Sequence, residues 1–289
     1  MTHDYSDGDV AKAIGGNVLS HPRLDTSRPG RGIPTSSIRY LDGVFTMRPI
    51  IAGKTVYDLT QPLSPRTPRS SDHPEVRFDN VRWYSRHGVR TSTVFLSVHV
   101  GTHVDAPALY EHDGASIDQI PLEKLCGTAV FVDVRKDDWG EIGPADLEAS
   151  PEKIVAGDIV VLRTGWSKHY GNEQRYVLKA PGLTKDGFDW LVAKGVRLIA
   201  SDSPSPEHIF MRSRQWRDLR PDVFGTAQID PAKFPPSYGH KTMFAAGICL
   251  LEGLGGEIDL VPVHRAELIA LPLKYVGVEA AQARVVALV

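Results

Sequence analysis

Cysteine is scarce in this chain, and it has neither a long hydrophobic run nor an excess of charge of one sign. The 289 residues include two cysteines, Cys126 and Cys249, both in apolar stretches, so we expect no disulfide framework. No run is apolar enough to predict a membrane span. A net charge of −2 gives no general attraction to nucleic acid or to an anionic membrane, so neither partner is expected.

Several motifs of common enzyme classes are also missing. The sequence has no Walker-type phosphate loop, no GxGxxG opening a helix and no GxSxG nucleophile elbow. The first residues lack a basic start followed by an apolar core, so a signal peptide is not predicted and a cytoplasmic location is the expectation.

The composition divides the chain into two parts. Residues 1–50 are rich in Gly, Pro, Ser and Arg and show little periodicity, which predicts a partly irregular N-terminal extension. It is either a disordered tail or an arm that wraps a partner subunit or covers the site. Residues 51–289 are long enough for one domain with a large core.

The hydrophobic pattern of this domain predicts a strand-rich mixed α/β fold rather than a helical bundle or a regular βαβ alternation. Strands are expected at Thr55–Leu59, Val76–Arg82, Thr128–Val134, Asp158–Arg163, Val196–Ser201, Gly247–Leu251, Ala266–Pro272 and Ala283–Leu288. Helices are expected at 185–194, between the N-cap Thr184 and Gly195, and at Gly143–Ser150 and His240–Ala246.

The most informative stretch is HVGTHVDAP, residues 99–107. It places His99, His103 and Asp105 within seven residues, and these side chains suit zinc or manganese. Val94–Val98 indicates a strand that enters the stretch. A straight strand would hold His99 and Asp105 about 20 Å apart, too far for one ion.

The strand must therefore bend if all three residues bind a metal. Gly101 tolerates the backbone angles of a bulge or turn, and Pro107 ends the strand. The alternative is a His-rich edge strand that binds nothing.

A metal site needs further ligands, and position alone does not choose among the downstream candidates His169, His208, His240 and His264. His240 follows a proline-rich loop, where ligands commonly lie. Glu252 ends an apolar run, so it either points into a site or is a solvated strand end.

The HVGTHVDAP stretch resembles the HxGTHxDxP signature of the cyclase family of metal hydrolases, which includes bacterial kynurenine formamidase and isatin hydrolase. The resemblance covers most of residues 54–289. The other matching passages are Tyr57–Thr60, Arg163–Trp166, Pro181–Leu183, Asp202–Ser205 and Leu271–Lys274.

The resemblance implies that His99, His103 and Asp105 form the first metal shell. The family also places a His and a Glu or Gln twelve residues apart, the spacing of His240 and Glu252. In its two-metal members the Asp bridges both ions, and the later pair holds the second. The implied cofactor is one or two zinc or manganese ions. The implied fold is a swivelling β/β/α-type domain, assembled as a homodimer or higher homo-oligomer whose neighbouring subunit can line the pocket.

One position departs from the family pattern. The family signature continues as HxGTHxDxPxH, and its final His is thought to act as an acid or base, but this chain has Leu109 at that position. Three explanations compete. Tyr110, Glu111 or His112 supplies the function from a shifted loop, Asp202 or Glu207 supplies it, or the reaction runs without it.

We expect a metal-dependent hydrolase of an amide, lactam, lactone or related bond in a small, cyclic or aromatic molecule. Glu252 would position the attacking water, and His112 is a candidate for proton transfer. Trp166, Tyr170, Asp202 and Tyr238 are the candidate substrate-binding residues, although ordinary loop packing explains the aromatic ones equally well. The basic stretch 212–217 either binds a carboxylate or is a solvated face.

Two other functions remain open. A lyase, dehydratase or cyclase would use the metal to stabilise an enolate next to a carbonyl. A binding protein on an altered enzyme scaffold would keep the metal without turnover.

Overall fold

The computed structural model describes residues 48–212, 220–225, 227 and 229–289. All of the predicted N-terminal extension except Arg48, Pro49 and Ile50 lies outside these residues, so its structure stays a prediction.

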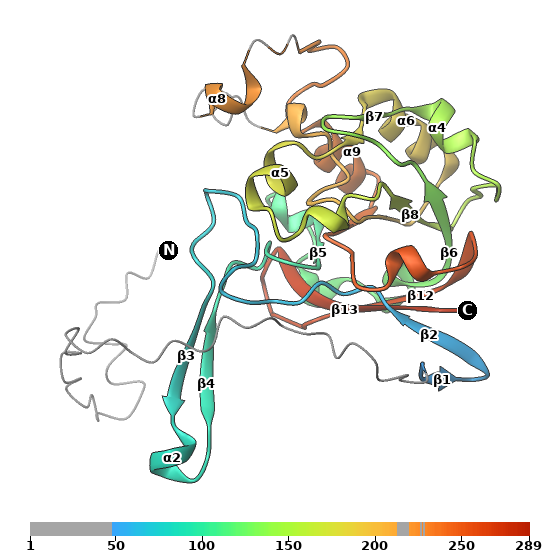
Figure 1. Ribbon diagram of the computed structural model, residues 1–289. Helices are drawn as coiled ribbons and strands as arrows, with labels where there is room; N and C mark the ends of the chain where they lie inside the picture. Colours follow the sequence, from blue (N-terminus) through green and yellow to red (C-terminus); the bar gives the residue numbers. More distant parts are fainter. Residues whose placement is uncertain (1–47, 213–219, 226, 228) are drawn as a thin grey trace. The chain divides into compact units, whose positions relative to one another are not determined.

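Seven strands form a closed, mixed β-barrel (Figure 1). In order around the barrel they are β13 (Ala280–Leu288), β12 (Arg265–Pro272), β6 (Cys126–Asp133), β8 (Ile159–Arg163), β10 (Leu198–Ser201), β11 (Cys249–Glu252) and β5 (His103–Asp105). The strands β6, β8, β10 and β11 are parallel, and the other pairings are antiparallel. Closure depends on β5, which pairs with β11 on one side and with β13 on the other.

The remaining elements are attached to this barrel. The strand β2 (Lys54–Asp58) pairs with β13, and β1 (Ile50–Ile51) pairs with β2. The others are β7 (Glu141–Ile142), β9 (Gly182–Leu183), α3 (Leu122–Leu125), α4 (Pro144–Glu148), α5 (Glu173–Leu178), α6 (Lys185–Lys194), α8 (Pro221–Phe224) and α9 (Tyr238–Ala245). Short 3-10 turns lie at Pro107–Leu109, Ile117–Gln119, Ser167–His169, Ile209–Met211 and Ile258–Leu260.

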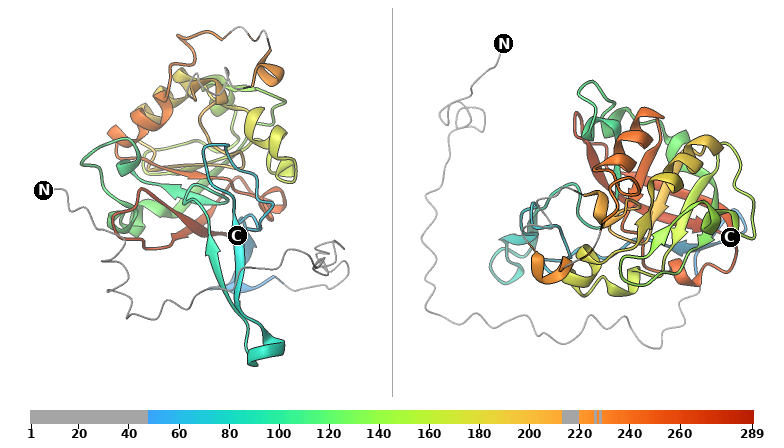
Figure 2. Two further views of the ribbon diagram at one scale, coloured as in Figure 1. Left: turned by 90° about the vertical axis from the view of Figure 1, so that its left-hand side faces the viewer. Right: turned by 90° about the horizontal axis from the view of Figure 1, so that it is seen from above.

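The parallel strands are buried on both faces, which explains their continuous Val, Ile and Leu content. Along β8, Ile159 and Val161 face the core inside the barrel. Val160 and Leu162 alternate with them and pack under the helices. The helices α4, α6 and α9 lie together on that outer face (Figures 1 and 2), and α6 packs against both of the others.

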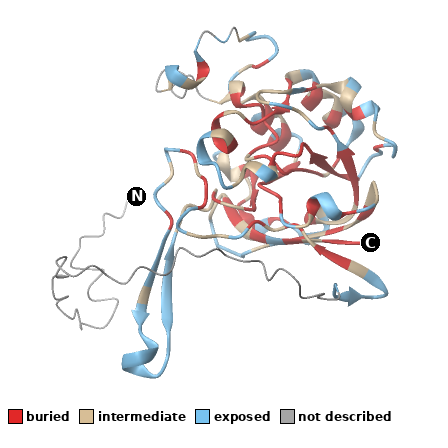
Figure 3. Ribbon diagram, viewed as in Figure 1, coloured by how far each residue is buried: buried red, intermediate tan, exposed pale blue. Residues whose placement is uncertain are grey.

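A hairpin projects from the barrel (Figure 3). It consists of β3 (Arg77–Arg82), the short helix α2 (Tyr84–His87) and β4 (Thr91–Phe95), and nearly every one of its residues is exposed. Its exposed side chains include several large apolar ones: Phe78, Val81, Trp83, Tyr84, Val89, Val94 and Phe95. Among the described residues, no helix combines the length and the apolar character that a membrane crossing requires.

The predicted mixed α/β class is confirmed, and each predicted strand and helix of the domain appears within a few residues of its expected bounds. Thr184 caps α6, with its hydroxyl accepting a hydrogen bond from Gly187 N at 3.3 Å. One prediction needs correction. The strand expected at Val94–Val98 ends at Phe95, because the chain turns before it reaches His99. The swivelling β/β/α assignment is finer than the observed architecture and stays a prediction.

Candidate metal centre

The HVGTHVDAP stretch is bent, as the ligand geometry requires. His99 lies in a turn, and only His103–Asp105 forms a strand. The turn passes through Gly101, whose φ of +77° is favourable for glycine. A Cβ there would also overlap Leu63 Cδ2, so the Leu63 side chain would have to shift to admit it. The strand ends where Pro107 begins a 3-10 turn.

Strand pairing brings the distant carboxylate to the histidines. In the β5–β11 ladder, His103 lies directly opposite Glu252. The distance between His103 Nε2 and Glu252 Oε2 is 3.5 Å. Glu252 is therefore a buried strand end that points into a site, and the solvated alternative is excluded by its 3% exposure.

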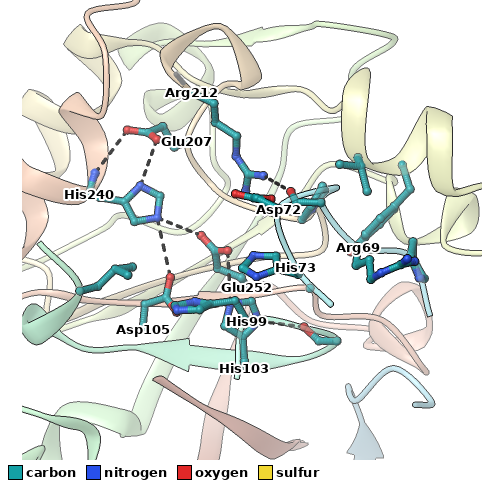
Figure 4. A pocket seen from close by; sticks show the side chains of 18 of the residues that line it. Arg69, Asp72, His73, His99, His103, Asp105, Glu207, Arg212, His240 and Glu252 are labelled. Carbon is teal, nitrogen blue, oxygen red and sulfur yellow. Dashed lines mark hydrogen bonds and ion pairs between the residues drawn. The ribbon is translucent and has the colours of Figure 1, made fainter. Parts of the chain in front are cut away.

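Four side chains, those of His99, His103, His240 and Glu252, converge on the carboxylate of Asp105 (Figure 4). With Asp105 they form two groups that share this residue: His99, His103 and Asp105, and Asp105, His240 and Glu252. Asp105 Oδ1 lies 2.9 Å from His99 Nδ1 and 3.3 Å from His103 Nε2. Asp105 Oδ2 lies 3.7 Å from His240 Nε2, which is 3.5 Å from Glu252 Oε1. We call these five residues the His/Asp/Glu cluster.

Several buried polar atoms of the cluster have no good hydrogen bond within the described part of the protein. His103 Nε2, Asp105 Oδ1 and Glu252 Oε1 are buried, and although they lie 2.9 to 3.5 Å from other atoms of the cluster, none of them makes a hydrogen bond of acceptable geometry there. Orphaned buried polar atoms are costly, and a cation at their centre would pair with all of them. Imidazole and carboxylate donors fit zinc and manganese, so the cluster is a candidate metal site.

The charges of the cluster perturb its own protonation. Burial lowers the pKa of His99, but the neighbouring carboxylates, Asp105 first, raise it to about 9. Burial favours the neutral form of Asp105, yet the histidines hold the pKa of this carboxyl well below its usual range. The carboxylates also raise the pKa of His103 and His240 against the effect of burial. The cluster therefore attracts positive charge, which protons or a metal ion supply.

Each histidine is held by a hydrogen bond at its other ring nitrogen. His240 Nδ1 pairs with Glu207 Oε2 at 3.0 Å, and Glu207 Oε1 accepts a bond from Gly239 N at 2.7 Å. His103 Nδ1 pairs with the Gly101 carbonyl at 2.9 Å, and His99 Nε2 pairs with Glu279 at 3.1 Å. Such partners fix the ring orientation and tautomer of metal-binding histidines.

The cluster lies in a cavity of about 280 Å³, which suits a small molecule. Tyr170, one of the predicted substrate-binding residues, lines it. Leu109 lines it as well, so the position that departs from the family pattern faces the site with an apolar side chain. Its neighbour Tyr110 also lines the cavity and lies against His240, with ring centroids 5.4 Å apart.

The structure does not bring His112 to the cluster. Its side chain is 96% exposed, and it pairs with the equally exposed Asp113 at 3.0 Å. The turn that carries it is a polar surface turn. A role for His112 in proton transfer therefore has no support in the geometry.

The other three candidate substrate-binding residues lie outside the cavity lining. Trp166 is 1% exposed and donates its indole N–H to the Tyr176 carbonyl. Asp202 is fully buried and accepts hydrogen bonds from the backbone at Thr164, Gly165 and Trp166. Both hold the turn after β8 and are not among the residues that line the cavity.

Tyr238 is directed toward α6, where its hydroxyl donates to Asp189 at 2.6 Å. The alternatives His169, His208 and His264 also lie away from the cavity. His208 is buried against the Trp139 carbonyl, and His264 contacts Arg163.

Sequence reasoning missed residues of the loop after β2. His73 lines the cavity and stacks on His99, with ring centroids 5.7 Å apart, and its Nδ1 pairs with Ser97 Oγ at 3.0 Å. Arg69 also lines the cavity. The polar run RSSDH between two prolines is the one available signal. It gives no reason to place this loop next to a cluster thirty residues later.

Comparison with known proteins identifies relatives of this chain. The family model described as "Putative cyclase" matches residues 57–208. The chain is 30% identical over 235 residues to a kynurenine formamidase from Erythrobacter litoralis (strain HTCC2594), covering 81% of this chain and 93% of that protein.

Two solved structures share the fold. Isatin hydrolase A from Labrenzia aggregata, bound to benzyl benzoate, is similar with a TM-score of 0.68 and 25% identity, covering 82% of this chain and 94% of that chain. A potential metal-dependent hydrolase with cyclase activity has a TM-score of 0.61 and 28% identity, covering 81% and 98%. The chain therefore belongs to the cyclase family, and it is related to kynurenine formamidase and isatin hydrolase.

Proposed function

We propose that this protein is a metal-dependent hydrolase that cleaves an amide or lactam C–N bond, or a related ester or lactone, in a small molecule. The observation that carries the proposal is the convergence of two ligand groups on the shared carboxylate of Asp105, inside a cavity of ligand size. The relationship to a kynurenine formamidase and an isatin hydrolase supports the C–N bond as the first choice.

The geometry supports a division of roles among the cluster residues. His99, His103 and Asp105 would hold one ion, and Asp105, His240 and Glu252 would hold a second or complete the first site. Zinc and manganese are the metals that this donor set favours. When bound, such an ion polarises a carbonyl and acidifies water.

The protein's own groups then handle orientation and protons. Glu252 is buried at the cluster and has two carboxylate oxygens, so the oxygen that does not hold an ion is the proposed acceptor for the proton of the attacking water. Leu109 carries no proton to the leaving group. Tyr110, the next residue, also lines the cavity and has a hydroxyl group, so it is the proposed donor.

The test is a panel of formamides, lactams and lactones assayed with zinc- and manganese-loaded protein in labelled water. The proposal predicts metal-dependent turnover and one labelled oxygen in the product carboxylate. Turnover without label would favour the lyase alternative. Stoichiometric metal with no turnover across the panel would favour a binding protein.

We further propose that the protein is a homodimer or higher homo-oligomer, assembled through the projecting hairpin. A two-stranded hairpin is marginally stable alone, and an exposed apolar surface of this kind marks an interaction site. Trp83 and Tyr84 are 54% and 74% exposed at its tip. Light scattering after chromatography should give a multimer for the wild type and a smaller species for Trp83→Ser. A monomeric wild type would contradict the assembly.

A further inference from the structure

The cavity has a second set of polar groups, separate from the His/Asp/Glu cluster. Arg69, Arg212 and Tyr176 line it, and all three side chains are hydrogen-bond donors. Figure 4 shows Arg212 entering the cavity from the side opposite His99 and His103, with Arg69 at a third side. We call these three residues the donor wall.

Arg212 has unused donors. It follows directly on the turn Ile209–Met211, and its Nη1 donates to Ser70 Oγ at 3.0 Å. Within the described residues no ion pair includes its guanidinium, although Asp72 also lines the cavity. A guanidinium has five N–H donors, so one bond to a hydroxyl leaves most of them available.

The other two members contain buried donors without acceptors. The Tyr176 hydroxyl belongs to a side chain that is 3% exposed, and it has no hydrogen-bond partner in the described part of the chain. Arg69 Nε is in the same condition, although the terminal nitrogens of Arg69 reach Glu75 at 3.8 Å and Glu173 at 3.3 Å. By contrast, the Tyr170 hydroxyl donates to the Pro62 carbonyl.

These groups match one ligand chemistry. Two guanidinium groups and a phenol hydroxyl around one cavity offer several N–H and O–H donors and positive charge, the recognition pattern for a carboxylate. Asp72 and Glu207 line the same cavity, but neither forms an ion pair with Arg212 within the described residues, so a neutral substrate would leave its guanidinium without a direct ionic partner. Unmet buried donors are costly, so an acceptor from the ligand is favoured.

We propose that the substrate is an anion whose carboxylate binds the donor wall while its scissile bond lies at the His/Asp/Glu cluster. This proposal rests on the hydrolase function and specifies its substrate class. The cavity volume of about 280 Å³ restricts the substrate to a small molecule, such as a single ring that bears both groups.

The test uses matched ligands on zinc-loaded protein. The substrates are the meta and para isomers of formamidobenzoate, each compared with the formamidobenzamide that replaces the carboxylate by a neutral carboxamide. Formate release gives kcat/KM, and calorimetry with carbamoylbenzoates against benzenedicarboxamides gives Kd, once chromatography has shown that neither ligand is hydrolysed. We expect at least one carboxylate isomer to be preferred about tenfold in both measurements, the scale of a charge-assisted hydrogen bond.

The variants assign this preference to the donor wall. Arg212→Gln should reduce the carboxylate-to-carboxamide ratio to about one, and Arg212→Lys should recover part of it. Tyr176→Phe should reduce it several-fold. Arg66→Gln is the matched control, because Arg66 is exposed in the same loop as Arg69 and lies outside the cavity lining. Circular dichroism and zinc content identify any variant that fails to fold.

The outcomes separate this proposal from the hydrolase function. A wild type without carboxylate preference, or an Arg212→Gln variant that weakens both ligands of a pair equally, overturns the donor wall. Turnover without carboxylate preference would support the hydrolase function and contradict the donor-wall proposal. Carboxylate binding that depends on Arg212, with no turnover of any substrate, would support the donor wall and contradict the hydrolase function.

Discussion

At the scale of single residues, the candidate metal centre depends on side chains that do not face the ion. Glu207 holds His240 through its ring nitrogen, and two backbone N–H groups, of Gly239 and His240, hold Glu207. The family signature drew attention to Glu207 only as a substitute acid. Both of its oxygens are occupied, so the structure gives it a positioning role instead.

This role predicts the effect of Glu207→Gln. The amide keeps an acceptor for one partner but loses the charge that favours the required tautomer of His240. Affinity for the ion at the His240 group should fall about tenfold or more, the usual effect of removing such a partner. Competition titration against a chelating dye measures it. Glu75→Gln, an exposed change, should leave the affinity at the wild-type value, and equal affinities for all three proteins would contradict the role.

A second residue-scale prediction concerns pH. Burial lowers the pKa of His208 to about 4, so the folded state keeps this ring neutral. The unfolded chain binds a proton near pH 6.5 and the folded protein does not, so His208 reduces stability as the pH falls from about 6.5 toward about 4. The loss reaches about 3 kcal/mol at the lower end.

Urea unfolding of the wild type and of His208→Gln between these pH values measures the contribution. The carboxylates titrate equally in both proteins, so the difference belongs to the histidine. The slope of unfolding free energy against pH should be shallower in the variant. Parallel profiles would show that His208 titrates normally in the folded protein.

At the scale of elements, the three-residue strand β5 decides both the closure of the barrel and the position of the ligands. The turn through Gly101 delivers His103 and Asp105 between β11 and β13. The ladder then sets His103 opposite Glu252, 149 positions later in the chain. The HVGTHVDAP motif is therefore joined by Glu252, and the candidate metal site is complete, only when the barrel closes.

Two glycine substitutions test the turn. Gly101 and Gly88 both have positive φ, at +77° and +68°, but a Cβ at Gly88 meets nothing within 4 Å. Gly88→Ala should cost about 1–2 kcal/mol of stability from backbone strain alone. Gly101→Ala should cost more, because of the contact with Leu63, and it should also lower bound metal. Equal losses, with metal retained in both, would show that the turn does not position the ligands.

The elements themselves were largely predictable from the sequence. Strands such as Ile159–Arg163 are dense in β-branched residues, and α6 has both an N-cap and a terminating glycine. The bend at Gly101 was predictable, because a straight strand would hold His99 and Asp105 farther apart than the bonds of one metal ion can reach. Closure of the sheet was not predictable, since β5 is too short to carry a pattern of its own.

The substrate side of the site was harder to predict than the metal side. Metal ligands can be recognised in a sequence because they are of a few residue types at regular spacings. An aromatic residue gives no such signal, because it occurs in the core as readily as in a pocket. Trp166 and Tyr238 are core and helix contacts, and Tyr170 alone of the predicted aromatic residues lines the cavity. Arg69 and His73 come from a loop whose position follows only from the folded barrel.

At the scale of the whole molecule, the His/Asp/Glu cluster joins three parts of the chain. His99–Asp105, His240 and Glu252 meet there, so a bound ion would crosslink the fold. Binding to the folded state alone stabilises it by about 4 kcal/mol when the free metal is at a thousand times its Kd.

Metal removal should therefore destabilise the protein. Treatment with a chelator should lower the Tm, and added zinc or manganese should restore it. His103→Ala should have the lower Tm from the start and show no response to either treatment. A wild-type Tm that is indifferent to chelator and metal would mean that no ion is held by the folded protein.

The central claim is that the His/Asp/Glu cluster binds a divalent ion. The most direct measurement is the metal content of the purified protein by elemental mass spectrometry, with His103→Ala and His240→Ala prepared identically. We predict near-stoichiometric zinc or manganese in the wild type and its loss in His103→Ala. A content near two that falls to about one in His240→Ala would support two ions that share Asp105. A wild type without bound metal, even after reconstitution, would contradict the claim.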